Sequence, residues 1–264
     1  MHVGRILDDT GVPRLVRRVS EEQVQPLSGN IFGRFWDQGD PLSTQSVRFL
    51  PPLMPSKVVG IGSNYTKHIE EMGRERPKQP KVFLKPNTSV VGHGDVIEIP
   101  PDTTRVDHEA ELAIVIGKHL YRASETEVWD GILGLTIVND VTARDFQRAD
   151  GVFTRGKGFN TFCPMGPWIL LGDKEELSRP RSIQCWVDGV LKQDSSTSDL
   201  LFGLSTLVSF VSNIMTLLPG DIIATGTPSG VSPLSDGQEV QIQIEGVGTL
   251  RNPVVNREDR CQVL

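Results

Sequence analysis

Cysteine and positive charge are scarce in this 264-residue sequence, and each shortage excludes a class of protein. Cys163, Cys185 and Cys261 lie far apart and form no C-x-x-C pair, so the sequence indicates neither a disulfide framework nor a zinc site. Lys and Arg number 27 against 33 Asp and Glu, and this net charge of −6 has the wrong sign for binding nucleic acid through the overall field. We therefore expect a cytoplasmic protein with no nucleic-acid partner.

A long apolar run is also missing. Asp8 and Asp9 lie where a secretory signal would need apolar residues, so we expect no targeting segment. Residues 200–218 carry no charge, yet hydroxyl and amide side chains interrupt them, and their apolar residues recur with the spacing of a one-sided helix. We predict a helix over residues 204–218 that does not cross a membrane, and we expect no membrane partner.

Glycine and proline, by contrast, are abundant. Together they make up 44 of 264 residues, more than the usual share of about an eighth, which favours many turns and short strands. Apolar runs and turns do not alternate regularly with helices, as a βαβ fold would require. We predict a mainly β fold with a few helices (α+β). It comprises a small N-terminal module over residues 1–52 and a larger domain over residues 53–264. Helices are expected at residues 64–72, 124–131 and 204–218.

Acidic residues alternate along the most informative segment, residues 105–117. In a strand, Asp107, Glu109 and Glu111 would share one face while His108 points to the other. Crowded carboxylates raise each other's pKa, and a hard divalent ion such as Mg²⁺ would relieve the repulsion. The alternative is a solvated strand edge. Asp140 follows the next apolar strand, either as a further oxygen ligand or as a cap for the turn after it, and the residues alone leave both open.

Three other segments carry groups suited to chemistry. If Asn64 caps a helix, His68 and Glu71 share a face, so Glu71 could orient an imidazole that takes a proton from water; a surface ion pair is the favoured alternative. Residues 73–80 suit either a lid over an anionic ligand or an ordinary surface loop. Lys157 lies between two glycines, where its ammonium can approach a ligand closely, although a solvated lysine is the default.

Four ordered motifs make the sequence resemble the fumarylacetoacetate hydrolase family from about Val58 to Val255. They are Gly62-Ser-Asn-Tyr-Thr-Lys-His68, Asp107-His-Glu-Ala-Glu-Leu112, Asn139-Asp-Val-Thr-Ala-Arg-Asp145 and Ala224-Thr-Gly-Thr-Pro-Ser-Gly-Val231. The resemblance, closest to the short bacterial members, implies a mixed β-roll with a small N-terminal module. It also implies a homodimer, because the short members commonly form one.

The resemblance implies a role for nine residues. Those implied as ligands of Mg²⁺, or of Mn²⁺ or Ca²⁺, are Glu109, Glu111 and Asp140. Those implied as substrate-binding residues are Arg144, Gln147 and Thr227. Those implied as catalytic are Lys157, which would stabilise negative charge on the substrate, and the pair His68 and Glu71, which would activate water.

The family implies an enzyme that depends on a divalent metal and acts on a small 2-oxo or enol (di)carboxylic acid. The implied reactions are C–C bond hydrolysis and decarboxylation through a metal-stabilised enolate. The same enolate chemistry serves 2-hydroxyhepta-2,4-diene-1,7-dioate isomerisation in aromatic catabolism and tautomerisation of an oxo acid, so these alternatives stay open. A non-catalytic metal- or anion-binding module is a further alternative, against which the retention of Lys157, His68 and Glu71 argues.

Overall fold

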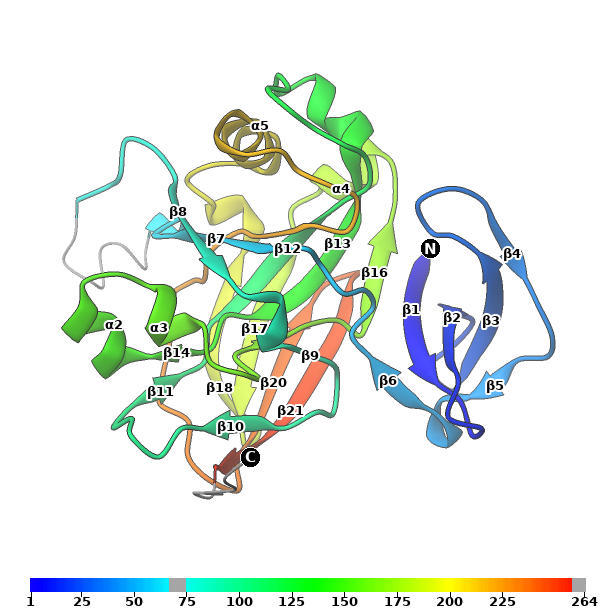
Figure 1. Ribbon diagram of the computed structural model, residues 1–264, viewed down its shortest axis with the longest axis horizontal. Coiled ribbons are helices and arrows are strands. Elements are labelled where there is room, and N and C mark those ends of the chain that lie inside the picture. The colour runs from blue at the N-terminus through cyan, green and yellow to red at the C-terminus, as the bar shows by residue number, and fades with distance from the viewer. Residues whose placement is uncertain (67–74, 258–264) are drawn as a thin grey trace, which may run out of the picture.

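Strands dominate the computed structural model, which describes residues 1–66 and 75–257 (Figure 1). Within these ranges the strands form a twelve-stranded sheet, a five-stranded sheet and two short two-stranded pairs. This architecture confirms the predicted mainly β class with few helices.

The N-terminal module contributes one end of the twelve-stranded sheet. Its strands are β1 (His2–Leu7), β2 (Pro13–Arg18), β3 (Gln23–Gly29), β4 (Phe35–Asp37), β5 (Leu42–Ser43) and β6 (Arg48–Leu50). Strand β1 pairs with β2 and β6, and it also pairs antiparallel with β16, where His2 lies opposite Leu170. The module is therefore hydrogen-bonded to the rest of the sheet, and the predicted boundary at residue 52 stays a prediction.

The remainder of the large sheet runs in the order β16–β13–β12–β19–β7–β8. These strands are β16 (Trp168–Leu171), β13 (Ile132–Asn139), β12 (Ala110–Ile116), β19 (Ile222–Ala224), β7 (Val58–Gly62) and β8 (Lys81–Lys85). All neighbours are antiparallel except β19 and β7. Every residue of β12 is buried, which agrees with its nearly continuous apolar sequence, since a strand covered on both faces needs apolar side chains on both.

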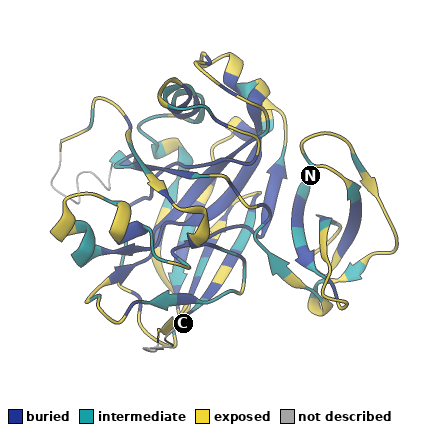
Figure 2. Cartoon of the chain, viewed as in Figure 1, coloured by how far each residue is buried: buried dark blue, intermediate teal, exposed yellow. Residues whose placement is uncertain are grey.

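A five-stranded sheet packs against this central part and encloses the main hydrophobic core (Figures 1 and 2). Its strands, in order, are β10 (Ile97–Ile99), β21 (Gly248–Asn256), β20 (Glu239–Ile244), β17 (Ser182–Val187) and β18 (Val190–Ser196). The short pairs are β11 (Val106–Asp107) with β14 (Thr142–Ala143), and β9 (Val90–Val91) with β15 (Cys163–Pro164).

The helices are short and lie around the sheets (Figure 1). Among residues 1–66 and 75–257, the α-helices are α2 (Arg144–Asp150), α3 (Thr154–Lys157), α4 (Lys174–Ser178) and α5 (Leu204–Ile214), and the 3-10 helices are η1 (Thr44–Ser46), η2 (Asn87–Ser89), η3 (Glu127–Gly131) and η4 (Thr197–Asp199).

Two helix predictions need correction. The helix expected at residues 124–131 is the 3-10 helix η3, although Ser124 N donates to Glu127 Oε2 at 2.9 Å as a capping box requires. The helix expected at 204–218 ends at Ile214, because Met215 is extended. In the part of the chain that the structure describes, no helix is long and apolar enough to span a membrane. The helix expected at 64–72 falls mostly outside the described residues.

Candidate functional site

Three buried carboxylates meet where β12 begins and β13 ends. Glu109 directly precedes β12, Glu111 lies within it, and Asp140 directly follows β13. Antiparallel pairing places Ala110 opposite Asn139, and Asp140 N donates to Glu109 O at 2.9 Å, so the strand ends hold the carboxylates together. One oxygen from each of the three lies within 4.8 Å of the others. We call these residues the acidic triad. The triad is buried, so the alternative of a solvated strand edge is wrong.

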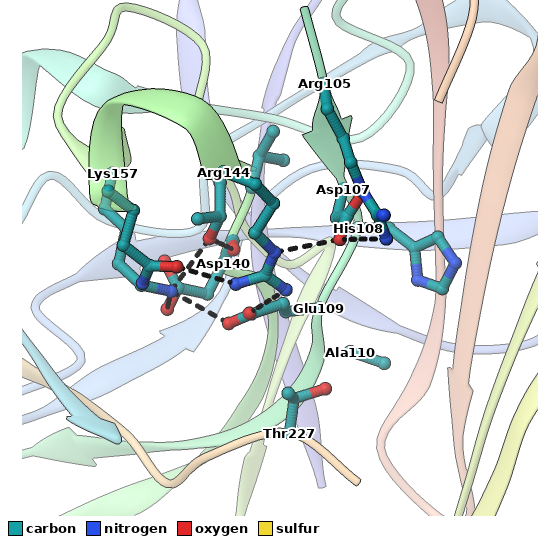
Figure 3. Close-up of polar contacts among 12 residues, drawn as sticks. Arg105, Asp107, His108, Glu109, Ala110, Asp140, Arg144, Lys157 and Thr227 are labelled. Atoms are coloured by element: carbon teal, nitrogen blue, oxygen red, sulfur yellow. Dashed lines mark hydrogen bonds and ion pairs between the residues drawn. The ribbon is translucent and has the colours of Figure 1, made fainter. Parts of the chain in front are cut away.

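Asp107 does not belong to this triad, because the predicted continuous strand is interrupted at residues 108–109. Its carboxylate accepts hydrogen bonds from Arg105 Nε at 2.8 Å and from Arg144 Nε at 2.8 Å. Arg144 also reaches Glu109, with 2.5 Å between Nη2 and Oε1, so its guanidinium lies between the two carboxylates (Figure 3). His108 points away from the triad, as the alternation predicted (Figure 3).

Two lysines form buried ion pairs with Glu109 and Asp140 of the triad. Lys157 Nζ donates to Glu109 Oε2 at 2.8 Å and to Asp140 Oδ2 at 2.5 Å (Figure 3). It also donates to the hydroxyl of Thr142 at 2.8 Å. Only 3% of Lys157 is exposed, so the default of a solvated lysine is wrong. Burial alone would lower the pKa of Lys157, but the charges of Asp140 and Glu109 outweigh it and raise that pKa.

The second lysine, Lys85, was missed by the sequence analysis. It ends β8 and is 1% exposed, and its Nζ donates to Asp140 Oδ1 at 2.6 Å and to Val141 O at 3.2 Å. Lys157 binds one oxygen of the Asp140 carboxylate and Lys85 binds the other. The N-cap residue of the following helix, α2, is Ala143. The capping alternative for Asp140 is therefore wrong.

Burial and the two neighbouring carboxylates both affect the ionisation of Glu111. Its pKa is raised well above the ordinary value, first because the carboxyl is buried and then because Asp140 and Glu109 repel its negative charge. Gly226 N donates to Glu111 Oε2 at 2.9 Å. A side chain at Gly226, whose φ is +99°, would lie 2.9 Å from Cβ of Asn64, so a glycine is required for this contact.

The triad fits a hard divalent cation. With Glu111 ionised, the triad and the neighbouring Asp107 carry four negative charges against the three positive charges of Lys85, Lys157 and Arg144, which leaves a net charge of −1 in a buried place. Carboxylate oxygens are the donors that Mg²⁺ and Ca²⁺ prefer, and a dication would change the net charge to +1, which suits an anionic ligand. Glu109, Glu111 and Asp140 would hold such an ion.

Aromatic rings form one wall of the site. Lys157 Nζ lies 4.9 Å from the centre of the Phe83 ring, and the ring of Phe153 meets Phe83 edge to face at 5.3 Å. A side-chain carbon at Gly60 would lie 2.1 Å from the Phe83 ring, so glycine makes room for it in β7. These rings reduce the access of water to the ammonium, which strengthens its interactions.

A cavity of about 50 Å³ lies beside the triad. The residues that line it include the triad, Lys157 and all three predicted substrate-binding residues, Arg144, Gln147 and Thr227. Arg144 Nη1 donates to Gln147 Oε1 at 3.1 Å. A larger cavity of about 980 Å³, between the N-terminal module and the five-stranded sheet, is lined by none of the predicted site residues.

The structure thus gathers seven of the nine predicted site residues around one cavity. Their roles as metal ligands, catalytic groups and substrate contacts stay predictions. His68 and Glu71 lie outside the described residues, as do residues 73 and 74 of the expected lid. Residues 75–80 form neither helix nor strand, and the lid stays a prediction.

Comparison with known proteins agrees with the four motifs. Residues 57–255 match the family model described as fumarylacetoacetate (FAA) hydrolase, C-terminal. The chain is 42% identical over 226 residues to oxaloacetate tautomerase YisK of Bacillus subtilis, with 80% of this chain and 74% of that protein covered.

Two solved structures are similar over nearly the whole chain. The first, 5-carboxymethyl-2-hydroxymuconate delta-isomerase from Mycobacterium smegmatis, has a TM-score of 0.88 and 41% identity, with 97% of this chain and 100% of that chain covered. The second, 2-hydroxyhepta-2,4-diene-1,7-dioate isomerase from Mycobacterium marinum, has a TM-score of 0.88 and 40% identity, with 98% and 100% covered.

Proposed function

Since the chain belongs to the fumarylacetoacetate hydrolase family, we propose that it catalyses keto–enol tautomerisation of a small 2-oxo dicarboxylic acid of the oxaloacetate type, with a divalent metal. Membership confirms the resemblance and the expectation of an enzyme. Tautomerisation was an alternative to hydrolysis and decarboxylation at the level of sequence, and the name of the Bacillus subtilis relative now favours it.

One observation carries the proposal. A buried ammonium, that of Lys157, contacts two carboxylates of the acidic triad beside a cavity that Arg144 and Thr227 also line. The ammonium of Lys157 therefore lies beside the cavity in which a bound 2-oxo acid would develop negative charge on its oxygen as it enolises.

The residues of the chain have separable tasks in this reaction. An ion held by the triad would act as a Lewis acid toward the oxo acid. Lys157 would stabilise negative charge on the enolising oxygen, and Arg144 and Thr227 would hold a carboxylate of the substrate by charge-assisted hydrogen bonds. His68, oriented by Glu71, remains the predicted group that accepts a proton.

Isomerisation of a hydroxymuconate-type dienoic acid is the second candidate. The observation that favours it is the similarity of two named isomerases, which extends over the N-terminal module as well as the domain that follows. Hydrolysis of an acylpyruvate and decarboxylation would use the same enolate and are outcomes of the same experiment.

The proposal also covers the metal ion, the cellular location and the oligomeric state of the enzyme. We propose Mg²⁺ as the ion, with Mn²⁺ or Ca²⁺ as substitutes, because all three triad ligands are oxygens. We also propose a cytoplasmic homodimer without a nucleic-acid or membrane partner and, if the isomerase candidate holds, a place in aromatic catabolism. The net charge of −6 supports the absence of a nucleic-acid partner.

The test is an absorbance assay with metal-stripped protein. Enol oxaloacetate, acetylpyruvate and 2-hydroxyhepta-2,4-diene-1,7-dioate are each supplied with and without Mg²⁺. We expect Mg²⁺ to restore ketonisation of enol oxaloacetate above the spontaneous rate, and Glu109→Ala to abolish it. Activity that survives both a chelator and Glu109→Ala would refute the metal-dependent scheme. Tight Mg²⁺ binding without turnover of any of the three would favour a non-catalytic binding module.

A further inference from the structure

A neutral hydrogen-bond network lies behind the acidic triad and ends at Thr227. Its central residue is Gln193 in β18, which is completely buried. Gln193 Oε1 accepts from Ala110 N at 3.1 Å, and Gln193 Nε2 donates to Pro228 O at 2.8 Å. A backbone N–H can only donate and a carbonyl oxygen can only accept, so these two contacts fix which end of the carboxamide carries the oxygen.

The orientation of the Gln193 carboxamide determines which of its neighbours, His108 and Thr227, donates a hydrogen bond and which accepts one. His108 Nδ1 lies 3.1 Å from Gln193 Oε1, so that ring nitrogen must carry a hydrogen and donate. In the neutral ring the other nitrogen, Nε2, is then an acceptor, and it lies 2.9 Å from the Ser232 hydroxyl. The Ser232 hydroxyl therefore donates to His108, and His108 donates to Gln193.

On the other side, Gln193 Nε2 donates to Thr227 Oγ1 at 2.8 Å. Because this oxygen is already an acceptor there, the hydroxyl hydrogen of Thr227 is available for a different partner. Thr227 is 5% exposed and lines the cavity beside the triad, so the cavity is where that partner would lie.

We propose that Gln193 is a positioning residue that makes Thr227 a hydrogen-bond donor to the ligand, so that the site selects a group that only accepts, such as an ionised carboxylate. This inference rests on the proposed function, since it specifies how the same cavity recognises a 2-oxo acid. A hydroxyl normally rotates to suit its partner, and here the buried carboxamide sets its direction before the ligand arrives.

The test compares Thr227→Val, Gln193→Met and the double variant. Thr227→Val keeps the shape of the side chain but removes the hydroxyl, and KM for oxaloacetate should rise roughly tenfold to a hundredfold with little change in kcat. Gln193→Met should raise KM similarly. If Gln193 acts through Thr227, the double variant should be no worse than the more severe single variant. Multiplied effects in the double variant, or an unchanged KM in Gln193→Met, would overturn the inference.

Gln193→Glu keeps the size of the side chain, but its second oxygen would face Pro228 O as well as Thr227 Oγ1, so its urea unfolding midpoint is measured beside its kinetics. Its second oxygen can only accept when ionised, so the Thr227 hydroxyl would turn to donate to it and be lost to the ligand. The matched control is Gln25→Glu in the N-terminal module, where a buried carboxamide donates to Gly39 O at 2.9 Å, and its kinetics should equal those of the wild type. Wild-type KM in a folded Gln193→Glu protein, at a pH where the introduced carboxyl is ionised, would overturn the inference.

Calorimetric titration with oxalate in the presence of Mg²⁺ separates this inference from the proposed reaction. Oxalate carries two acceptor-only carboxylates and needs no turnover. Tenfold weaker oxalate binding in Gln193→Met, with unchanged Mg²⁺ affinity, would support the inference even if the wild type turned over none of the three substrates. Equal oxalate affinity in the wild type and Gln193→Met would overturn it whatever the reaction.

Discussion

An ion pair of the N-terminal module and an ion pair of the acidic triad differ in how far their side chains are exposed. In the module, Arg17 pairs with Asp37 20 residues away, and their side chains are 32% and 52% exposed. In the triad, Lys157 pairs with Glu109 48 residues away, and their side chains are 3% and 7% exposed. Water solvates the first pair and is almost excluded from the second.

This difference indicates what each set contributes. An exposed pair changes the free energy of unfolding by only about 0–1 kcal/mol, because water and salt screen it. A buried pair loses the solvation of both charges, and apolar residues of the same size often stabilise a fold as well or better. The buried charges of the triad are therefore better explained by chemistry than by stability, and four substitutions test that contrast.

The largest effect is expected from Glu109→Ala. Removing one of three carboxylates should lower Mg²⁺ affinity by at least about a hundredfold, because even residues that only orient metal ligands can reach that factor, and turnover should be lost with the ion. Calorimetric Mg²⁺ titration and the enol oxaloacetate assay measure both. Asp37→Ala removes a carboxylate from the exposed set and should change neither. Wild-type Mg²⁺ affinity in Glu109→Ala would contradict the contrast.

Lys157→Met should affect turnover without impairing metal binding. Loss of the ammonium that faces the developing charge should lower kcat by about 10²–10³-fold at saturating Mg²⁺. Mg²⁺ affinity should be unchanged or higher, since a nearby positive charge is gone. Steady-state kinetics and metal titration on one preparation give both numbers, and a parallel fall in kcat and Mg²⁺ affinity would mean that Lys157 only supports the ion.

Lys85→Met should act mainly on stability. Without metal, the variant leaves Asp140 with one cation fewer in a buried place, and the free energy of unfolding should fall by about 3–5 kcal/mol. Mg²⁺ should restore part of this loss, because an ion that binds only the folded chain stabilises it. Urea unfolding measures the change, and Arg17→Met, which breaks an exposed pair, should cost only about 0–1 kcal/mol. Equal losses in the two variants would remove the distinction between the two sets.

The smallest effect concerns pH and the N-terminal module. The Thr10 hydroxyl and the Arg14 guanidinium hold the pKa of Asp8 below its ordinary value. A lowered pKa in the folded state means that ionised Asp8 favours folding; its contribution is complete above the unfolded pKa of about 3.9 and disappears as the pH falls further. Urea midpoints between pH 5 and pH 2 should therefore fall less steeply in Asp8→Asn than in the wild type. Parallel curves would exclude Asp8 as a source of this dependence.

The acidic triad could be predicted because its three residues lie on two strands that follow each other in the sequence. Glu109 and Glu111 lie two residues apart at the start of an apolar strand, and Asp140 ends the next strand, so the pairing of neighbouring strands brings them together. Asp107 belongs to the same alternation, but the chain leaves the strand at residues 108–109, where Glu109 N donates instead to Asn139 Oδ1 at 2.9 Å. Alternation in a sequence does not reveal such a break.

Lys85 and Gln193 could not be predicted, because their partners lie far away in the sequence. Lys85 ends a strand like many solvated lysines, and its partner Asp140 is 55 residues away. Gln193 lies in β18, whose residues are mostly exposed, and its partners His108 and Thr227 are 85 and 34 residues away. The helices α2 and α3 were missed for a different reason, since seven and four residues are too few to show a helical repeat.

The pairing of β1 with β16 has a consequence for shortened forms of the chain. Apart from β1, the other neighbour of β16 is β13, so a protein that begins after the N-terminal module would leave one side of β16 open. An open strand edge invites pairing with other molecules and aggregation. The first six strands therefore also protect the solubility of the remainder, and expression of the larger domain alone would require a mutated or covered β16 edge.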